Sequence, residues 1–387
     1  MKFFKLIAKN LLRHKLRTSL TMLGLAVAIL AFGLLRTVVT AWYAGVDASA
    51  SNRLISRDAV SFIFPLPYSY RDQIAKVPGV SEVSFATWFQ GTYVDNRPEH
   101  FFPRMAVDAE TIFDLYPEFL LPHDQLEAFK RERNSCVIGE KIAKEFNFKI
   151  GDIITIQGDI FPGTWQFVIR GIYKPKDKTV DPTQMFFHWT YLDEKLKQDS
   201  PFRAGNVGWY IIRIDNPEDA PAVSEAVDRM FENSPAKTKT ETEKAFQQSF
   251  VSLSSAIITS LEIVSYVIIG IILLVLANTI IMSARERIRE YAVLKTLGFT
   301  SKHIFILVAG EALFISIIGG AIGVAFTFPV VAGFGAAFPT FFPVFNIANS
   351  TLALAAVFSI IIGAVASIFP AIRSANIKIV DGLRQIG

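Results

Sequence analysis

The stretch that decides the fold is "IVSYVIIGIILLVLANTIIM" (residues 263–282), which is followed closely by "RERIREYAVLKTLGFTSKHI" (285–304). The first segment carries no charge and has about the 20 residues that a helix needs to cross a bilayer core of about 30 Å. The second segment is rich in charge, and the chain turns apolar again after it. We therefore expect a short charged helix between two membrane spans.

The composition also indicates a membrane protein. Of the 387 residues, 51% are hydrophobic and 19% are charged, which is more apolar than an ordinary soluble domain. The apolar residues gather in four runs that are long enough to span a bilayer, at residues 20–43, 253–282, 304–331 and 351–372. We expect an α-helical membrane protein with four transmembrane helices and a large α+β extracytoplasmic domain between spans one and two.

The basic residues predict the orientation of these spans. They gather in the leader, in the 283–303 loop and after residue 372, whereas acidic residues outnumber basic ones in the segment between the first two spans. By the positive-inside rule, both termini and the charged loop are cytoplasmic. The expected order is a cytoplasmic amphipathic helix (1–17), transmembrane helix 1 (18–46), the extracytoplasmic domain (47–250), transmembrane helix 2 (251–283), a cytoplasmic coupling helix (284–303), transmembrane helix 3 (304–331), a short outer loop (332–350), transmembrane helix 4 (351–372) and a cytoplasmic tail (373–387).

The first apolar run has a second interpretation, as a cleaved signal peptide, because basic residues precede it and "ASA" (48–50) resembles a cleavage site. The run is longer than the apolar region of a typical signal peptide. Lys5, Lys9, Arg13 and Arg17 recur at every fourth position before it, as in a helix lying on the inner membrane surface. We therefore favour an uncleaved anchor.

The segment between spans one and two mixes strand and helix patterns. Strands are predicted at 79–94, 152–158, 165–173 and 207–215, and helices at 139–147 and 217–234. The aromatic stretches "FIFPLPYSY" (62–70) and "MFFHWTY" (185–191) suit a hydrophobic core, with a ligand groove as the alternative. The one cysteine, Cys136, is interpreted as a small buried hydrophobe.

Three charged residues fall inside or near the spans. Arg36 lies late in the first run, where snorkelling to the outer interface is favoured over contact with a substrate. Glu262 lies at the outer end of the second span. Glu311 lies inside the third span, where an ionised carboxylate is costly without a partner. We expect a partner among the nearby basic residues of the cytoplasmic loop, such as Lys302 or Arg289.

Several kinds of chemistry lack a motif in this sequence. It contains no GxxxxGK[ST], HExxH, paired CxxC or GxSxG, and its five histidines are scattered. We expect no catalytic residue, no metal site, no cofactor in this chain and no nucleic-acid partner. Any ATP and Mg²⁺ would be bound by another polypeptide.

The charged loop resembles the coupling segment of MacB/FtsX-type ABC transporter permeases, which has the approximate pattern RER-x-x-EI-x-x-L-(K/R)-x-(L/M)-G. Other parts of the chain also resemble this family: "LVAGEALFISIIGGAIGV" with Glu311, the tail "FPAIRSANIKIVDGLR", the leader "AKNLLRHKLRTSLTMLGLAVAI" and the domain segment "VIGEKIAKEFNFKIGDIITIQG". The chain departs from the pattern at Tyr291, Ile379 and Gly382, and it has no fused ATPase domain.

The resemblance implies a bacterial inner-membrane permease dimer, of two identical or two related chains, served by a cytoplasmic ABC ATPase dimer. It implies that ATP-driven motion is transmitted to the exported domain, and that Glu311 has a structural or coupling role within the membrane. It also implies that the following residues contact or orient the ATPase: Arg285, Glu286, Arg287, Glu290, Leu294, Lys295 and Gly298. A charged surface helix with ordinary i,i+3 pairs, such as Arg287 with Glu290, is the alternative.

Three functions are compatible with this layout. The first is export or extraction of a hydrophobic or amphipathic cargo such as a lipid, lipoprotein, peptide or drug, with or without a periplasmic adaptor or carrier. The second is an FtsX-like signalling module that regulates a periplasmic partner such as a cell-wall hydrolase. The third, an ATP-independent scaffold, leaves the coupling loop unexplained. The size of the exported domain favours export.

Overall fold

The computed structural model describes residues 15–177, 179–337, 342 and 344–380. The chain divides into two compact units. The membrane unit comprises Met1–Ala41, Ser255–Ala336 and Phe345–Gly387, and the exported unit comprises Trp42–Ser254 and Ala337–Val344. Residues 1–14 of the expected leader helix and Gly382 of the tail motif lie outside the described residues.

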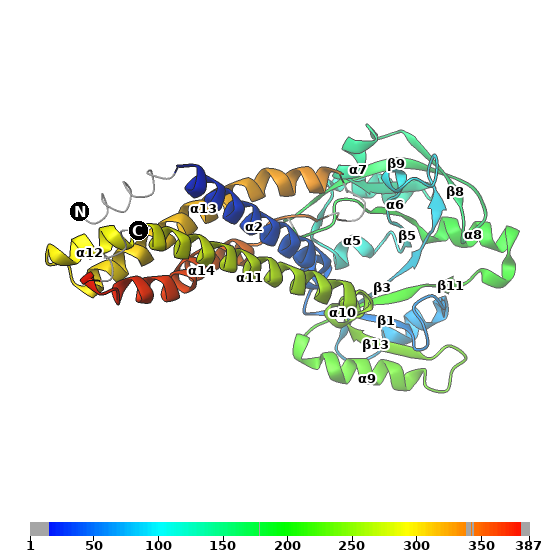
Figure 1. Cartoon of the computed structure of the whole chain (residues 1–387). Helices are drawn as coiled ribbons and strands as arrows, with labels where there is room; N and C mark the ends of the chain where they lie inside the picture. The colour runs from blue at the N-terminus through cyan, green and yellow to red at the C-terminus, as the bar shows by residue number, and fades with distance from the viewer. Residues whose placement is uncertain (1–14, 178, 338–341, 343, 381–387) are drawn as a thin grey trace. The chain divides into compact units, whose positions relative to one another are not determined.

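The described part of the membrane unit contains four helices that are long and apolar enough to cross a bilayer. They are α2 (Lys15–Trp42), α11 (Ser255–Glu286), α13 (Ser301–Ala337) and α14 (Asn349–Ala375). This confirms the predicted fold class, with the large mixed domain inserted between the first and second spans (Figure 1).

The helix ends differ from the predicted span ends. The second span, expected at 251–283, is α11, which begins at Ser255 after the separate helix α10 (Glu243–Leu253) and continues to Glu286. The third span, expected at 304–331, lies within the longer helix α13. Hydropathy marks only the part of a helix that lies in lipid, whereas the backbone hydrogen bonds continue into the polar interface.

Small residues allow α13 to approach its neighbours closely. A Cβ added at Gly323 would come 2.6 Å from the carbonyl oxygen of Ala26 in α2, and one at Gly319 would come 2.9 Å from that of Met22. On an adjacent side of α13, a Cβ at Gly320 would overlap a side chain of α14. Backbone approach over small residues is a usual basis of helix packing in membranes, so these glycines fix the positions of α2 and α14 against α13.

The exported unit is built on one mixed sheet of 11 strands among the described residues, in the order β13-β1-β12-β3-β5-β10-β7-β9-β8-β4, with β6 paired to β9. The strands of this sheet are β1 (Arg53–Asp58), β3 (Val80–Trp88), β4 (Gly91–Thr92), β5 (Arg104–Val107), β6 (Phe119–Leu120), β7 (Ser135–Gly139), β8 (Ile153–Gly158), β9 (Gly163–Pro175), β10 (Met185–His188), β12 (Trp209–Ile214) and β13 (Thr238–Thr242). A second, two-stranded sheet pairs β2 (Leu66–Pro67) with β11 (Asn206–Val207).

Helices cover both faces of the large sheet. They are α3 (Ala44–Ala48), α4 (Arg71–Ile74), α5 (Ile112–Leu115), α6 (His123–Arg131), α7 (Glu140–Glu145), α8 (Trp189–Asp199), α9 (Ala220–Met230) and α10. Successive residues of a strand point to opposite faces, and accordingly Leu54 joins one hydrophobic cluster while Ile55 joins another. The sheet thus has a separate core on each face.

The predicted strands and helices of this unit are confirmed, but one core prediction is wrong. Cys136 is buried and free, and all four residues of β10, the first part of "MFFHWTY", are buried. In "FIFPLPYSY", however, Phe62, Ile63 and Phe64 are exposed. They lie in the loop between β1 and β2, and Leu66 is the first residue after them whose side chain is buried.

The packing of α13 on α2 predicts a position-specific effect of Gly323→Val. The added side chain would meet the backbone of α2, and overpacking of this kind costs about 1–3 kcal/mol. We expect a lower midpoint of thermal unfolding for the full chain in detergent. Gly333→Val in the same helix is the matched control, because a Cβ there meets no atom within 4 Å. Equal effects of the two substitutions would contradict this packing.

Candidate coupling site

The charged segment between the second and third spans forms the short helix α12 (Ile288–Thr296), drawn in yellow at one end of the membrane unit in Figure 1. Arg287 separates α12 from α11, with φ −102° and ψ 10°. At the other end, Gly298 has φ +91°, and the N–H groups of Gly298 and Phe299 donate to the carbonyls of Lys295 and Leu294. This is a Schellman motif, which favours glycine at the left-handed position. The helix therefore ends before Gly298, short of the expected end at residue 303.

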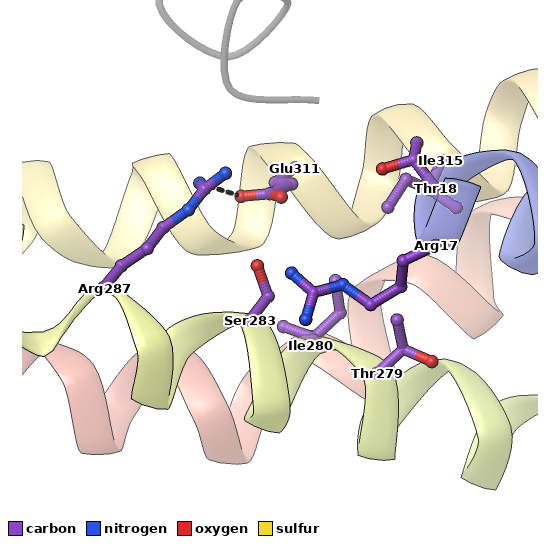
Figure 2. Close-up of a pocket in the computed structure, with 8 residues that line it drawn as sticks. All are labelled: Arg17, Thr18, Thr279, Ile280, Ser283, Arg287, Glu311 and Ile315. Atoms are coloured by element: carbon purple, nitrogen blue, oxygen red, sulfur yellow. Dashed lines mark hydrogen bonds and ion pairs between the residues drawn. The ribbon is translucent and has the colours of Figure 1, made fainter. Parts of the chain in front are cut away.

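A buried ion pair joins the start of α12 to the third span. Arg287 Nη1 lies 2.9 Å from Glu311 Oε2, and both side chains are buried. Figure 2 shows the two side chains meeting between α11 and α13, with Ser283 and Arg17 beside them. The residues around the pair line a cavity of about 10 Å³, which is about the room that one water molecule needs. Pairing of this kind lowers the cost of a carboxylate inside an apolar helix.

The expected basic partner of Glu311 from the cytoplasmic loop is confirmed, but it is neither of the two residues named as examples. Arg289 and Lys302 are both exposed, and the basic residue that contacts Glu311 is Arg287. Successive residues of a helix are rotated by about 100°, so Arg289 lies on nearly the opposite side of the backbone from Arg287. The sequence places several arginines close enough to Glu311 to pair with it. It does not show where α11 ends and α12 begins, and this break decides which arginine faces Glu311.

Two further contacts bind this region to other spans. Arg17 of α2 forms an ion pair with Glu286 at the end of α11, with 2.8 Å between Nη1 and Oε2. Lys295 Nζ donates to the carbonyls of Ala375 (2.6 Å) and Ile377 (2.8 Å), where α14 ends. Carbonyls at a helix C-terminus lack partners within the helix and favour a cation. Lys295 therefore caps α14 and fixes the far end of α12.

Tyr291, which departs from the isoleucine of the family pattern, is fully enclosed beside the Arg287–Glu311 pair. Burial and the nearby Glu311 carboxylate raise the pKa of Tyr291 to about 12. Its phenol is therefore neutral near pH 7 and stays a hydrogen-bonding neighbour of Arg287. Relative to isoleucine, tyrosine replaces a branched aliphatic side chain with a larger aromatic ring and adds a hydroxyl to a polar site.

The residues predicted from the family pattern divide between the inside and the outside of this region. Arg287 is buried, and Leu294, Lys295 and Glu290 are partly buried, whereas Arg285, Glu286 and Gly298 are exposed. The outward face of α12 also includes Arg289, which the sequence analysis considered only as a partner of Glu311, and Val293 and Leu297, which it did not single out. These three residues lie at spacings of four. Leu297 is 71% exposed. The i,i+4 spacing of two exposed apolar residues and an arginine was the signal that could have found this face.

A second ion pair joins α2 and α11, the two helices that Arg17 and Glu286 also connect. It lies near the opposite end of these helices. Arg36 of α2 lies 2.7 Å from Glu262 of α11, measured from Nη1 to Oε1. Both side chains are partly exposed. Arg36 therefore pairs with a neighbouring span at the level where the sequence placed the outer interface.

Within the exported unit, Arg53 joins the two segments that connect the domain to spans one and two. Its Nε donates to Glu243 Oε2 at 2.8 Å, and its Nη2 donates to Glu118 Oε1 at 2.6 Å. The backbone N–H of Ala50 also donates to Glu243, at 3.0 Å. Burial opposes the charge of Arg53, but the bond to Glu118 and the charge of Glu243 outweigh burial and raise the Arg53 pKa. The start of β1 and the start of α10 are thus held together.

The described residues contain no group of three or more His, Cys, Asp or Glu side chains that could hold a metal ion. The charged contacts of the membrane unit connect different helices to one another. What this arrangement can do is hold the helices in fixed relation and present the outward face of α12 to a partner.

Comparison with known proteins identifies both units. A model of the MacB-like periplasmic core domain matches residues 18–230, and a model of the FtsX-like permease C-terminal region matches residues 262–379. The periplasmic region of MacB from Actinobacillus actinomycetemcomitans is 11% identical and covers 53% of this chain and 95% of its own, with a TM-score of 0.39. The extracellular domain of YknZ, a noncanonic ABC-type transporter from Gram-positive bacteria, is 12% identical and covers 49% of this chain and 99% of its own, with a TM-score of 0.36.

Two curated relatives align with parts of the chain. An uncharacterized ABC transporter permease protein of Mycobacterium tuberculosis is 22% identical over 199 residues, which are 51% of this chain and 22% of that protein. The uncharacterized ABC transporter permease YvrN of Bacillus subtilis is 32% identical over 110 residues, which are 28% of this chain and 25% of that protein. The chain thus spans about a quarter of the length of these relatives. Since one family model covers more than half of the chain and a second covers its C-terminal spans, the chain belongs to the MacB/FtsX-type family of ABC transporter permeases.

Proposed function

We propose that this chain is a permease subunit that transmits ATP-driven motion of a separate cytoplasmic ABC ATPase to its exported domain. The motion would export or extract a hydrophobic or amphipathic cargo, with ATP and Mg²⁺ bound by the ATPase and none by this chain. The observation that carries the proposal is the outward face of α12, a helix that is held to the membrane spans by Arg287 at its start and by Lys295 near its end. A second permease chain completes the proposed complex in the bacterial inner membrane.

The proposed ATPase contact is the face formed by Arg289, Val293 and Leu297, with Glu290 and Arg285 at its edges. Arginine is enriched among the few residues that supply most of the binding energy of an interface, and Val293 and Leu297 add exposed apolar surface beside it. The inward residues Arg287 and Lys295 are assigned a positioning role, because their charged groups are bound within this chain.

The proposed transmission follows the contacts of α12. A force on its outward face passes through Arg287 to α13 and through Lys295 to α14, while Glu286 at the adjoining end of α11 is paired with α2. Coupling between distant sites requires such a contiguous set of packed or charged contacts. The arrangement supports a mechanism in which the spans move together and the exported domain follows.

The first prediction concerns the outward face. Arg289→Glu removes a charged contact, and Leu297→Asp removes an apolar one. Loss of such a contact at the centre of an interface typically costs about 2 kcal/mol of binding energy, or roughly 30-fold in affinity for the ATPase. We expect stimulation of the partner ATPase to fall accordingly in the reconstituted complex, and Glu290→Lys to act in the same direction. Arg229→Glu in the exported domain is the charge-matched control. Normal stimulation with Leu297→Asp would reject the assigned face.

The second prediction concerns the end of α12. Gly298→Val places a β-branched residue at φ +91°, which strains the backbone, and Gly298→Pro cannot adopt that angle at all. We expect both to abolish ATPase stimulation while the protein still inserts and dimerises. Gly298→Asn is the matched control, because asparagine tolerates this conformation, and it should retain most of the stimulation. Equal activity of the valine and asparagine variants would show that the turn is not needed.

The third prediction separates stability from transmission at the buried pair. Glu311→Leu leaves Arg287 buried without its carboxylate, a change that typically costs about 3–5 kcal/mol, so the thermal midpoint should fall. The double variant Arg287→Met/Glu311→Leu should regain much of that stability, because an apolar pair of similar volume is often neutral. Glu286→Ala, at the partly exposed pair, is the control and should cost at most about 1 kcal/mol.

If the pair transmits motion, the stable double variant will still show weakened stimulation of the ATPase. Full stimulation of the ATPase by that variant would show that Arg287 and Glu311 have only a structural role. The stability readout and the coupling readout therefore test different statements about the same two residues.

Export and signalling are distinguished by what leaves the membrane. In the proposed export function, the complex in vesicles releases a lipid-like or peptide cargo only when ATP is supplied, as followed by mass spectrometry of the released material. Release that continues unchanged without ATP would contradict export. A stoichiometric hydrolase partner, with no cargo, would instead support the FtsX-like signalling function.

A further inference from the structure

The loop between β1 and β2, residues 59–65 ("AVSFIFP"), exposes an uncharged, strongly apolar surface. Val60 is 82% exposed, Phe62 41%, Ile63 76% and Phe64 52%. Isolated exposed apolar residues are common, but a contiguous group of them marks an interaction surface. The proposed ATPase coupling makes no use of this loop.

The loop has a defined conformation that presents these side chains. Asp58 Oδ1 accepts hydrogen bonds from the N–H groups of Val60 (2.9 Å) and Ser61 (3.2 Å). The N–H of Phe64 donates to the carbonyl of Ser61 at 3.1 Å. The turn therefore satisfies its own backbone groups while it directs apolar side chains outward.

Contacts within the exported unit place this loop beside the segments that lead into spans one and two. Helices α3 and α10 run antiparallel, since the N–H of Ala50 bonds to Glu243 and Gly45 lies against Gln247. Gly45 is three residues after Trp42, the last residue of α2, and Phe250 is five residues before Ser255, where α11 begins. The ring of Phe62 packs against that of Phe250, with 5.1 Å between centroids.

The level of Trp42 corresponds to the outer membrane interface. A hydrocarbon core of about 30 Å takes about 20 helical residues, which counted from Thr18 end near Thr37. Trp42 lies about 7 Å beyond that point at 1.5 Å per residue, within the layer of lipid headgroups. Trp42 and Tyr43 are the aromatic residues that favour this layer.

We propose that the loop 59–65 inserts Val60, Ile63 and Phe64 into the outer leaflet of the membrane. The exposed Lys237 lies at the base of the loop, where its carbonyl accepts the N–H of Ala59 at 2.8 Å. Basic residues beside an apolar surface suit a lipid interface, where the cation meets headgroup phosphates. The occupant of this surface is thus the lipid itself, and the loop gives the exported domain an attachment to the membrane besides its chain connections to spans one and two.

The test uses the full chain in phosphatidylcholine/phosphatidylglycerol vesicles, with Cys136→Ala removing the buried native thiol. An environment-sensitive fluorophore is attached through Ile63→Cys, or through Val60→Cys if the first variant fails to fold. Phe202→Cys is the matched control, because Phe202 is also an exposed apolar residue, at 84%, in the short 3-10 helix Pro201–Arg203. Quenching is measured with lipids that carry a doxyl group near the headgroup and with aqueous iodide.

We expect the label on the loop to be quenched several-fold more by doxyl lipid than the control label, and several-fold less by iodide. Quenching by iodide equal to that of Phe202→Cys would overturn the proposal. Protection from both quenchers would overturn it as well, because a second copy of the chain or another protein would then cover the loop. The result does not depend on the ATPase and therefore stands apart from the proposed function.

Discussion

The pair formed by Arg287 and Glu311 is the constraint on which the arrangement of the cytoplasmic end depends. A carboxylate inside an apolar helix is costly unless a cation meets it, and Arg287 is held there by the break between α11 and α12. The pair thus fixes the start of α12 against the third span. Lys295 fixes its far end against the fourth. With both ends bound, the orientation of α12 is determined, and Arg289, Val293 and Leu297 are left facing outward.

The same reasoning extends along the first two spans. Arg17 pairs with Glu286 at the inner end, and Arg36 pairs with Glu262 near the outer end. The two sites on α11 are 24 residues apart in sequence, or about 36 Å at 1.5 Å per residue. The two helices are joined at both ends, and between these ends α2 packs closely on α13 and α11 packs along α14. This arrangement resists separate bending. A displacement at the inner end then moves α2 and α11 together. The proposed function requires this behaviour.

The sequence was informative wherever a local rule governs the structure. Long apolar runs predicted the four spans, and residue alternation predicted strands such as β8. It was uninformative where the result depends on the direction in which a side chain points. Arg287 and Arg289 are equivalent by composition, and only the helix break decides which of them meets Glu311. The same holds for Lys295, whose acceptors lie about 80 residues further along the chain.

The loop at 59–65 shows a different limit of sequence reasoning. Its aromatic and β-branched residues have the composition of a core strand, and the sequence analysis interpreted them as core. The chain instead turns at Asp58, whose carboxylate accepts the N–H groups of the next turn, and the apolar residues emerge on the surface. A contiguous apolar surface outside a core marks a place where the chain meets another apolar medium. In a domain whose neighbouring segment ends in a membrane span, lipid is the medium that chain geometry places within reach. A domain attached to the membrane at this loop as well as at both chain connections would have fewer ways to rotate when its spans move, and more of the motion would reach the leaflet itself.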